Sequence, residues 1–231
     1  MRVLAIETAT EEVGVGLGVD GTLAASVAVR SGHRHTEALH PAVEAVLREG
    51  GLRPADLDAI AVDVGPGLFT GLRAGIAAAK ALGFALGVRL VPVTSTAVLA
   101  HAAACAEAAV VPVVDLRRRS LAFSLPGEED EPRLGPLEDL VAALRELGDV
   151  VLVGDGALRR REELAAALAA RRGSLAFAGR ELAAPPVVAL AELGEHRATQ
   201  GALVDPAAVV PCYLREPDAR ANFATRAGAS V

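Results

Sequence analysis

The 231-residue chain is poor in aromatic residues, cysteine and lysine, and each shortage excludes a class of protein or site. Aromatic residues make up 3% of the sequence, with no tryptophan and one tyrosine, which is too few for a single-strand nucleic-acid binder that stacks bases on aromatic rings. Cys105 and Cys212, the two cysteines, lie far apart and indicate neither a disulfide framework nor a paired-cysteine metal site. We expect two reduced thiols in a cytoplasmic protein. Lys80 is the only lysine.

Positive charge and long apolar runs are also limited. The net charge is −6 at pH 7 and the isoelectric point is near 5.4, which disfavours a protein that binds nucleic acid by neutralising phosphates itself. We expect any RNA to be reached through another subunit. Arginine runs at 117–119, 159–161 and 171–172 are typical of solvated faces, with a local contact to RNA phosphates as the alternative. Lys80 and Glu107 interrupt alanine-rich stretches, so we expect no membrane span.

Hydrophobic residues make up 52% of the sequence and charged residues 23%, which is enough for a buried core. Strand-like runs alternate with helical ones along the chain. The first half shows strands at 3–6, 13–19 and 23–29, with Asp20-Gly21 as a hairpin turn, then helix 36–48, strand 60–64, helix 70–86, strand 89–93 and helix 95–104. The second half is a looser repeat, with strands 110–114, 121–125, 150–153 and 174–177 and helices 136–147, 157–172 and 187–199.

This order predicts an α/β fold of two ribonuclease-H-like lobes, each a mixed sheet flanked by helices, as in the actin-like ATPase (ASKHA) superfamily. We place the N-terminal lobe at residues 1–105, the second and smaller lobe at 106–215, and a loose C-terminal tail at 216–231. Helix 187–199 is expected to pack back on the first lobe.

Two turns occupy the positions where ATPases of this superfamily hold phosphates. The segment Glu7-Thr8-Ala9-Thr10 replaces the pattern Asp-x-Gly-x-Thr, and Asp115 begins a turn that lacks the second pattern, Asp-x-Gly-Gly. Without glycine the backbone approaches a phosphate less easily. We read seven residues as remnants of a nucleotide site: Glu7, Thr8, Thr10, Asp115, Gly154, Asp155 and Gly156. We therefore expect no active phosphotransferase site and no cofactor.

A glycine-rich block, Gly65-Pro66-Gly67-Leu68-Phe69-Thr70-Gly71-Leu72-Arg73, joins a strand to a helix. Backbone N–H groups at such a helix start can hold an anion. The block is not a P-loop, because no Gly-Lys-Ser/Thr closes it and Lys80 lies too far along the helix. The alternative, a tight turn without a ligand, is the more common use of such a loop.

Three histidines, His33, His35 and His40, lie close together in the sequence. Their spacing does not match the four-residue interval of a helical metal pair, and no third ligand is evident nearby. We expect structural or solvated histidines and no metal site.

Several segments together resemble the TsaB (YeaZ-type) family of bacterial tRNA threonylcarbamoyladenosine biosynthesis. The similar segments are Leu4 to Thr10, His35 to Pro41, Val62 to Leu82 and Pro211 to Arg215. The resemblance implies a paralogue of the catalytic subunit TsaD. In TsaD a His-x-x-x-His motif binds a metal, and the aligned stretch here, Thr94 to Leu99, has no histidine.

The resemblance therefore implies a non-catalytic subunit. Such proteins pair with TsaD, and with the ATPase TsaE, for threonylcarbamoyl transfer to adenosine 37 of tRNAs that read ANN codons. They can also self-associate through the same surface as homodimers, and tRNA is reached indirectly, through the complex.

Family members pair through helices of the N-terminal lobe, and two helices here suit that role. The helix that begins at Thr70 offers small residues that let another backbone come close, and the preceding helix offers larger side chains. The candidate interface residues are Leu39, Val43, Val46, Leu68, Phe69, Arg73, Ala74, Ala77, Ala78, Lys80 and Ala81. The alternative is that both helices only cover their own sheet.

Two rival functions remain. A stand-alone actin-like ATPase or small-molecule kinase would need two intact glycine-containing phosphate loops, and a metallopeptidase would need a metal site.

Overall fold

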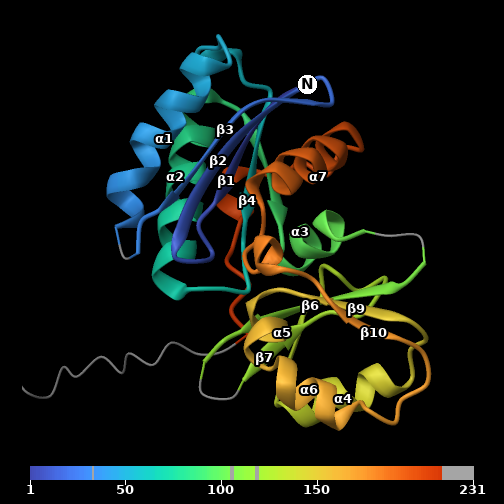
Figure 1. Cartoon of the computed structure of the whole chain (residues 1–231). Helices are drawn as coiled ribbons and strands as arrows, with labels where there is room; N and C mark the ends of the chain where they lie inside the picture. The colour runs from blue at the N-terminus through green and yellow to red at the C-terminus, as the bar shows by residue number, and fades with distance from the viewer. Residues whose placement is uncertain (33, 105–106, 118–119, 215–231) are drawn as a thin grey trace, which may run out of the picture.

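The first lobe is built on a five-stranded sheet with helices on both faces (Figure 1). The computed structural model describes residues 1–32, 34–104, 107–117 and 120–214. The strands of the first lobe are β1 (Arg2–Glu7), β2 (Glu12–Val19), β3 (Thr22–Arg30), β4 (Ala59–Asp63) and β5 (Arg89–Val93). Its helices are α1 (His35–Glu49), α2 (Phe69–Leu86) and α3 (Ser95–Ala102), with a 3-10 turn η1 (Pro54–Asp56).

The second lobe follows from residue 107. Its strands are β6 (Ala109–Asp115), β7 (Leu121–Phe123), β8 (Arg133–Gly135), β9 (Val150–Val153) and β10 (Leu175–Phe177). Its helices are α4 (Leu137–Arg145), α5 (Asp155–Arg159) and α6 (Arg161–Ala167), with a 3-10 turn η2 (Arg180–Leu182). The chain then forms α7 (Val187–Thr199) and a last 3-10 turn, η3 (Pro206–Ala208).

The two sheets share one topology. The strand order is β3-β2-β1-β4-β5 in the first and β8-β7-β6-β9-β10 in the second. In each sheet the first three strands pair antiparallel and the last two join in parallel. This repeat of two mixed sheets agrees with the predicted pair of ribonuclease-H-like lobes.

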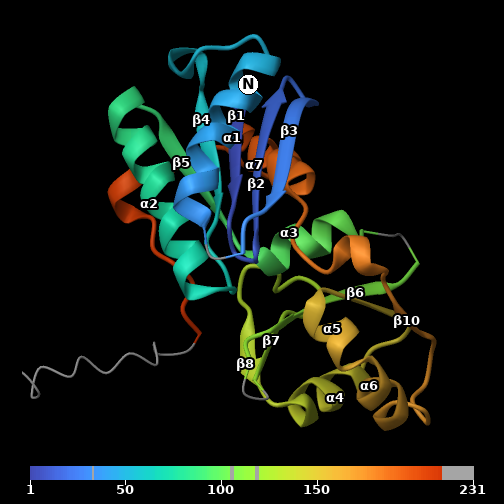
Figure 2. The ribbon, with the colours of Figure 1, turned by 60° about the vertical axis from the view of Figure 1, so that its left-hand side comes forward.

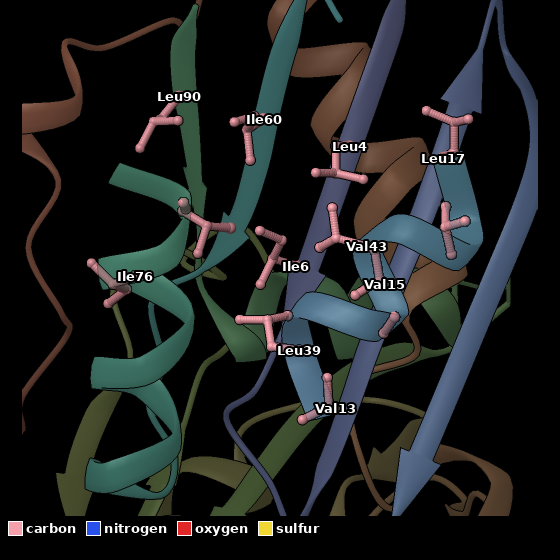
Figure 3. Close-up of a cluster of buried hydrophobic side chains, with 14 of the residues drawn as sticks. Leu4, Ile6, Val13, Val15, Leu17, Leu39, Val43, Ile60, Ile76 and Leu90 are labelled. Atoms are coloured by element: carbon pink, nitrogen blue, oxygen red, sulfur yellow. The ribbon is translucent and has the colours of Figure 1, made fainter. Parts of the chain in front are cut away.

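Strand β1 buries both of its faces, which explains its nearly continuous apolar sequence. Leu4 and Ile6 contribute to a core beneath α1 and α2 (Figure 3), whereas Val3 and Ala5 contribute to a second core with residues of α3 and α7. Helix α7 thus covers the face of the first sheet opposite α1 and α2. A third core fills the second lobe beneath α4 and α6.

The segment after α7 runs back along α2. Figures 1 and 2 show it on the side of α2 away from α1. We call Leu203–Leu214 the strap. At its start Leu90 and Val204 exchange two backbone hydrogen bonds, of 3.0 and 2.8 Å, and so cover the outer edge of β5.

Some local expectations differ from the structure. Helix α1 begins at His35 and continues through Pro41, which lies on its exposed face. The helix expected at 157–172 is split into α5 and α6 at Arg160. Both residues of the expected hairpin turn, Asp20 and Gly21, have positive φ, as a tight two-residue hairpin requires. The lobe limits at 105 and 215 stay predictions, and the tail at 216–231 lies outside the described residues.

Helix α2 is long and apolar enough to cross a membrane, by length and composition alone. It has 18 residues and a mean hydropathy of 1.2, although the sequence predicted no span. A buried helix of a folded domain meets the same criterion, and α2 packs through Leu72, Ile76 and Ala79 against the first core.

Candidate functional site

A cavity of about 970 Å³ lies between the lobes. The turn after β1, the loop before α2, the end of β6 and the start of α5 all line it. Of the predicted nucleotide-site remnants, Thr10, Asp115 and Asp155 face this cavity, whereas Glu7 and Thr8 are buried behind it. The structure therefore brings both degenerate turns to one cleft.

The glycine-rich block is used for packing at this cleft. The Leu68 N–H donates to the carbonyl oxygen of Ala9 at 2.7 Å. A Cβ atom at Gly67 would overlap the same oxygen, and one at Gly71 or Gly75 would overlap atoms of Thr8. The three glycines thus let the turn after β1 lie directly against the start of α2. One N–H group of this loop that could face an anion, that of Leu68, is therefore already bound by the chain's own backbone.

A buried pair of carboxyl groups lies beneath this junction. Glu7 and Asp63 end the neighbouring strands β1 and β4. Glu7 Oε1 accepts the Ala9 N–H, and Asp63 Oδ1 accepts the Gly65 N–H and the Ser95 hydroxyl, all at 2.7 Å.

Each carboxyl in this pair has one remaining oxygen, Glu7 Oε2 and Asp63 Oδ2, without a conventional partner. Burial, followed by the neighbouring Asp63, holds the pKa of Glu7 well above its usual value, and burial also raises the pKa of Asp63. A proton on Glu7 satisfies both free oxygens by linking the two groups, so we assign Glu7 as the protonated partner.

The second turn presents acidic groups to the cleft. The Asp115 N–H donates to Asp155 Oδ1 at 2.9 Å, and the Arg117 N–H donates to Asp115 Oδ1 at 2.9 Å. Arg159 lies 3.6 Å from Asp115 and 3.3 Å from Asp155. Burial raises the pKa of Asp155. This turn keeps the aspartate of the ATPase pattern but not its glycines, and Gly154 and Gly156 pack against Val113.

Helix α3 begins where the resemblance places the metal-binding histidines of TsaD. Here Thr94 and Thr96 each donate a hydroxyl to the carbonyl oxygen of Glu129, at 2.9 and 2.7 Å, and so tie α3 to the second lobe. Ser95 instead binds Asp63. All three hydroxyl groups donate to oxygen atoms of the protein itself, so their role here is structural.

Of the three clustered histidines, His35 is buried and donates Nε2–H to the carbonyl oxygen of Thr10 at 2.7 Å. The imidazole therefore fixes the turn after β1. His40 is exposed beside Glu44, and His33 lies outside the described residues. Within the described ranges no group of three histidine, cysteine, aspartate or glutamate side chains could hold a metal ion.

The outer face of α2 is a second candidate site. Its exposed residues follow a helical stripe: Thr70, Arg73, Ala77, Ala81, Phe84 and Ala85. Phe84 is 61% exposed. An apolar stripe of this kind is normally covered. The predicted interface residues Arg73, Ala77 and Ala81 lie on it, and their contact with a partner stays a prediction. Ala74 and Ala78 border it and are half-buried.

Other predicted interface residues lie elsewhere. The prediction that Leu39, Val43 and Val46 contact a partner is wrong, because all three are buried and pack in the first core (Figure 3). Their spacing marks the inward face of α1, and the sequence alone could not separate that face from an interface. Leu68 and Phe69 line the mouth of the cleft.

The strap is the feature that the sequence did not predict. Lys80 Nζ donates to the carbonyl oxygens of Ala207 and Val209, at 3.2 and 2.9 Å. Arg73 Nε donates to the Tyr213 hydroxyl at 3.0 Å. The Phe69 and Tyr213 rings stack with centroids 5.0 Å apart. The segment Pro211 to Arg215, part of the family resemblance, could have pointed to an ordered strap. Nothing in its sequence indicated that it contacts α2.

Comparison with known proteins agrees with this geometry. The model of the TsaD family, described as tRNA N6-adenosine threonylcarbamoyltransferase, matches residues 27–223. The tRNA threonylcarbamoyladenosine biosynthesis protein TsaB of Escherichia coli strain K12 is 43% identical over 90 residues, which are 39% of this chain and 38% of that protein. TsaB of Bacillus subtilis strain 168 is 32% identical over 118 residues, 51% of this chain and 52% of that protein. The aligned stretches span about half or less of these relatives.

Solved structures extend the similarity over both lobes. YeaZ from Pseudomonas aeruginosa has a TM-score of 0.72 and 25% identity, with 92% of this chain and 99% of that chain covered. The activator of 2-hydroxyisocaproyl-CoA dehydratase from Clostridium difficile, solved with bound ADPNP, has a TM-score of 0.52 at 10% identity over 87% of this chain and 97% of that chain, and shares the fold alone. The predicted two-lobed fold of the actin-like ATPases is confirmed.

Proposed function

The chain belongs to the TsaD family and is of the TsaB, or YeaZ, type, and on this premise we propose that it is a non-catalytic subunit for tRNA threonylcarbamoyladenosine formation. In this role it pairs with a TsaD-type paralogue, and works with a TsaE-type ATPase, for threonylcarbamoyl transfer to adenosine 37. The complex operates in the cytoplasm and carries the tRNA contacts that this acidic chain is poorly suited to make alone.

The observation that carries the proposal is the uncovered outer face of α2. Thr70, Ala77 and Ala81 are small and exposed, so the backbone of another helix can approach closely. Phe84 extends the same stripe with a large apolar side chain that is 61% exposed. No other element in the described part of the chain covers this face. A paralogous helix of similar shape is the partner that this surface fits.

The non-catalytic role is supported by the state of the cleft. The Leu68 N–H already donates to the Ala9 carbonyl oxygen, and both turns lack the glycines that let a backbone approach a phosphate closely. The stretch Thr94 to Leu99, which aligns with the metal-binding motif of TsaD, has no histidine, and its Thr94 and Thr96 bind the second lobe instead. The rival function, a stand-alone ATPase, has in its favour only the size of the cleft.

The experiment is a reconstitution with the TsaD-type and TsaE-type proteins of the same organism, unmodified tRNA and the threonylcarbamoyl donor. We expect modified adenosine 37 to form at least about tenfold faster with this chain than without it, and no ATP turnover by the chain alone. An equal rate without the chain, or robust ATP hydrolysis by the chain alone, would overturn the proposal.

A further inference from the structure

The strap and the outer face of α2 form one continuous surface. Two of the most exposed large apolar side chains in the described ranges are Val210, at 69%, and Phe84, at 61%. Val210 follows Val209, whose carbonyl accepts from Lys80, and Phe84 lies one turn beyond Lys80 on α2. Residues four apart on a helix differ by about 40° in direction. The strap therefore borders the exposed stripe on the flank of α2 away from α1 (Figure 2).

Three anchors fix the strap in this place. Its start pairs with Leu90 at the edge of β5. Its end donates the Cys212 N–H to the Val64 carbonyl at 2.7 Å. The 3-10 turn η3 lies between these two anchors. There Lys80 of α2 donates to the carbonyl oxygens of Ala207 and Val209. A charged donor to backbone carbonyls is stronger than a neutral one, so the only lysine in the chain holds the middle of the strap.

We propose that Lys80 is a positioning residue: it clamps the strap against α2 so that Val210 and Tyr213 form, with the α2 stripe, one composite surface for the TsaD-type partner. This inference rests on the proposed function and assigns a new part of the surface to it. The match to the TsaD family, over residues 27–223, includes both α2 and the whole strap. The sequence analysis placed Lys80 in the interface, whereas here it acts through the strap.

The strap also reaches the cleft. Cys212, Tyr213 and Leu214 line the mouth of the cavity, as do Leu68 and Phe69 at the start of α2. Arg73 lies with its guanidinium carbon 3.7 Å from the centroid of the Phe69 ring and donates to Tyr213. The composite surface therefore extends from Phe84 to the mouth of the cleft.

The first test needs no partner. Lys80→Met keeps most of the apolar stem and removes the ammonium group, and Lys80→Arg restores a donor that can reach the same carbonyls. We expect hydrogen exchange of the strap amides to accelerate about tenfold or more in Lys80→Met, at Val204, Val209 and Cys212 among others. Exchange in α2 and in the sheet should stay unchanged. In Lys80→Arg the strap amides should exchange more slowly again. Unchanged strap exchange in Lys80→Met would overturn the clamp.

The second test measures the affinity for the TsaD-type paralogue of the same organism. Lys80→Met and Val210→Asp are each expected to weaken binding about tenfold or more. Arg172→Met, which removes an exposed charge from the second lobe, and Val188→Asp, on the opposite face of the first sheet, are the matched controls and are expected to bind like the wild type.

The outcomes separate the two proposals. If the wild type binds the paralogue and both Lys80→Met and Val210→Asp bind it equally tightly, the strap assignment is overturned. The pairing with TsaD is then left intact. No binding by the wild type would overturn the pairing, and the composite surface with it. If Lys80→Met fails to fold, Val210→Asp alone decides the matter, because Val210 is a surface residue.

Discussion

At the scale of single residues, the carboxyl pair Glu7 and Asp63 is the most unusual feature of the first lobe. The ATPase pattern Asp-x-Gly-x-Thr begins with aspartate at the position that Glu7 takes in this chain. Here the side chain is buried, one of its oxygens accepts the Ala9 N–H, and burial raises its pKa, for which reason we assign it as the protonated partner of Asp63. Glu7 takes the position of the ATPase aspartate, but its side chain fixes the backbone of the turn at Ala9.

This pair predicts a dependence of stability on pH. A carboxyl whose pKa is raised on folding binds more protons folded than unfolded, so its contribution to stability is full below the unfolded value of about 4.5 and falls as the pH rises toward the folded pKa. Glu7→Gln keeps an acceptor for Ala9 and supplies a permanent donor to Asp63. We expect its free energy of unfolding to gain on the wild type by about 1.4 kcal/mol per pH unit between pH 4.5 and the raised pKa of folded Glu7.

Urea titrations between pH 5 and pH 8 provide the measurement. Glu162→Gln is the control, because Glu162 is exposed on α6 of the second lobe and its substitution should leave the slope unchanged. A constant difference between wild type and Glu7→Gln across this range would show that Glu7 is already ionised in the folded protein.

At the scale of secondary-structure elements, α2 owes its position to three glycines spaced four residues apart. Gly67, Gly71 and Gly75 form a groove in which Thr8 and Ala9 lie. Glycine in a helix normally costs about 1 kcal/mol relative to alanine, so Gly71 and Gly75 within α2 need a packing reason, and the overlap that a Cβ would cause with Thr8 provides it.

Gly71→Ala tests this packing. Alanine would improve helix propensity, but its Cβ would overlap the Thr8 carbonyl, so we expect a net loss of about 2 kcal/mol in the free energy of unfolding, measured with urea. Gly148→Ala is the matched control, because no atom lies near its added Cβ and its φ is not positive. A Gly71→Ala protein as stable as the wild type would refute the groove.

The elements of the first lobe could be predicted because their signals are local. Asp20-Gly21 indicated the hairpin, and the alternation of strands and helices indicated the lobes. The outward and inward faces of α1 could not be separated in the same way, because Leu39, Val43 and Val46 would show one spacing whether they met a sheet or a partner. The role of Lys80 was equally hidden, since its acceptors are backbone carbonyls more than 120 residues away.

At the scale of the whole molecule, side chains tie the lobes together around the cleft. Thr94 and Thr96 of the first lobe bind the Glu129 carbonyl, and Arg197 of α7 binds Asp130 of the same loop at 2.8 Å. These bonds connect the loop of Glu129 and Asp130 to α3 and α7 and so restrict movement of one lobe against the other. The outer face of α2 is an apolar surface that the described residues leave uncovered.

Direct binding to the TsaD-type paralogue of the same organism, measured by titration calorimetry with wild type, Ala77→Glu and Ala142→Glu, tests the central claim. Ala77 lies in the middle of the α2 stripe and Ala142 is an exposed alanine on α4 of the second lobe. We expect wild type and Ala142→Glu to bind equally and Ala77→Glu to bind at least about 100-fold more weakly while remaining folded. A folded Ala77→Glu protein that binds as tightly as the wild type would contradict the claim.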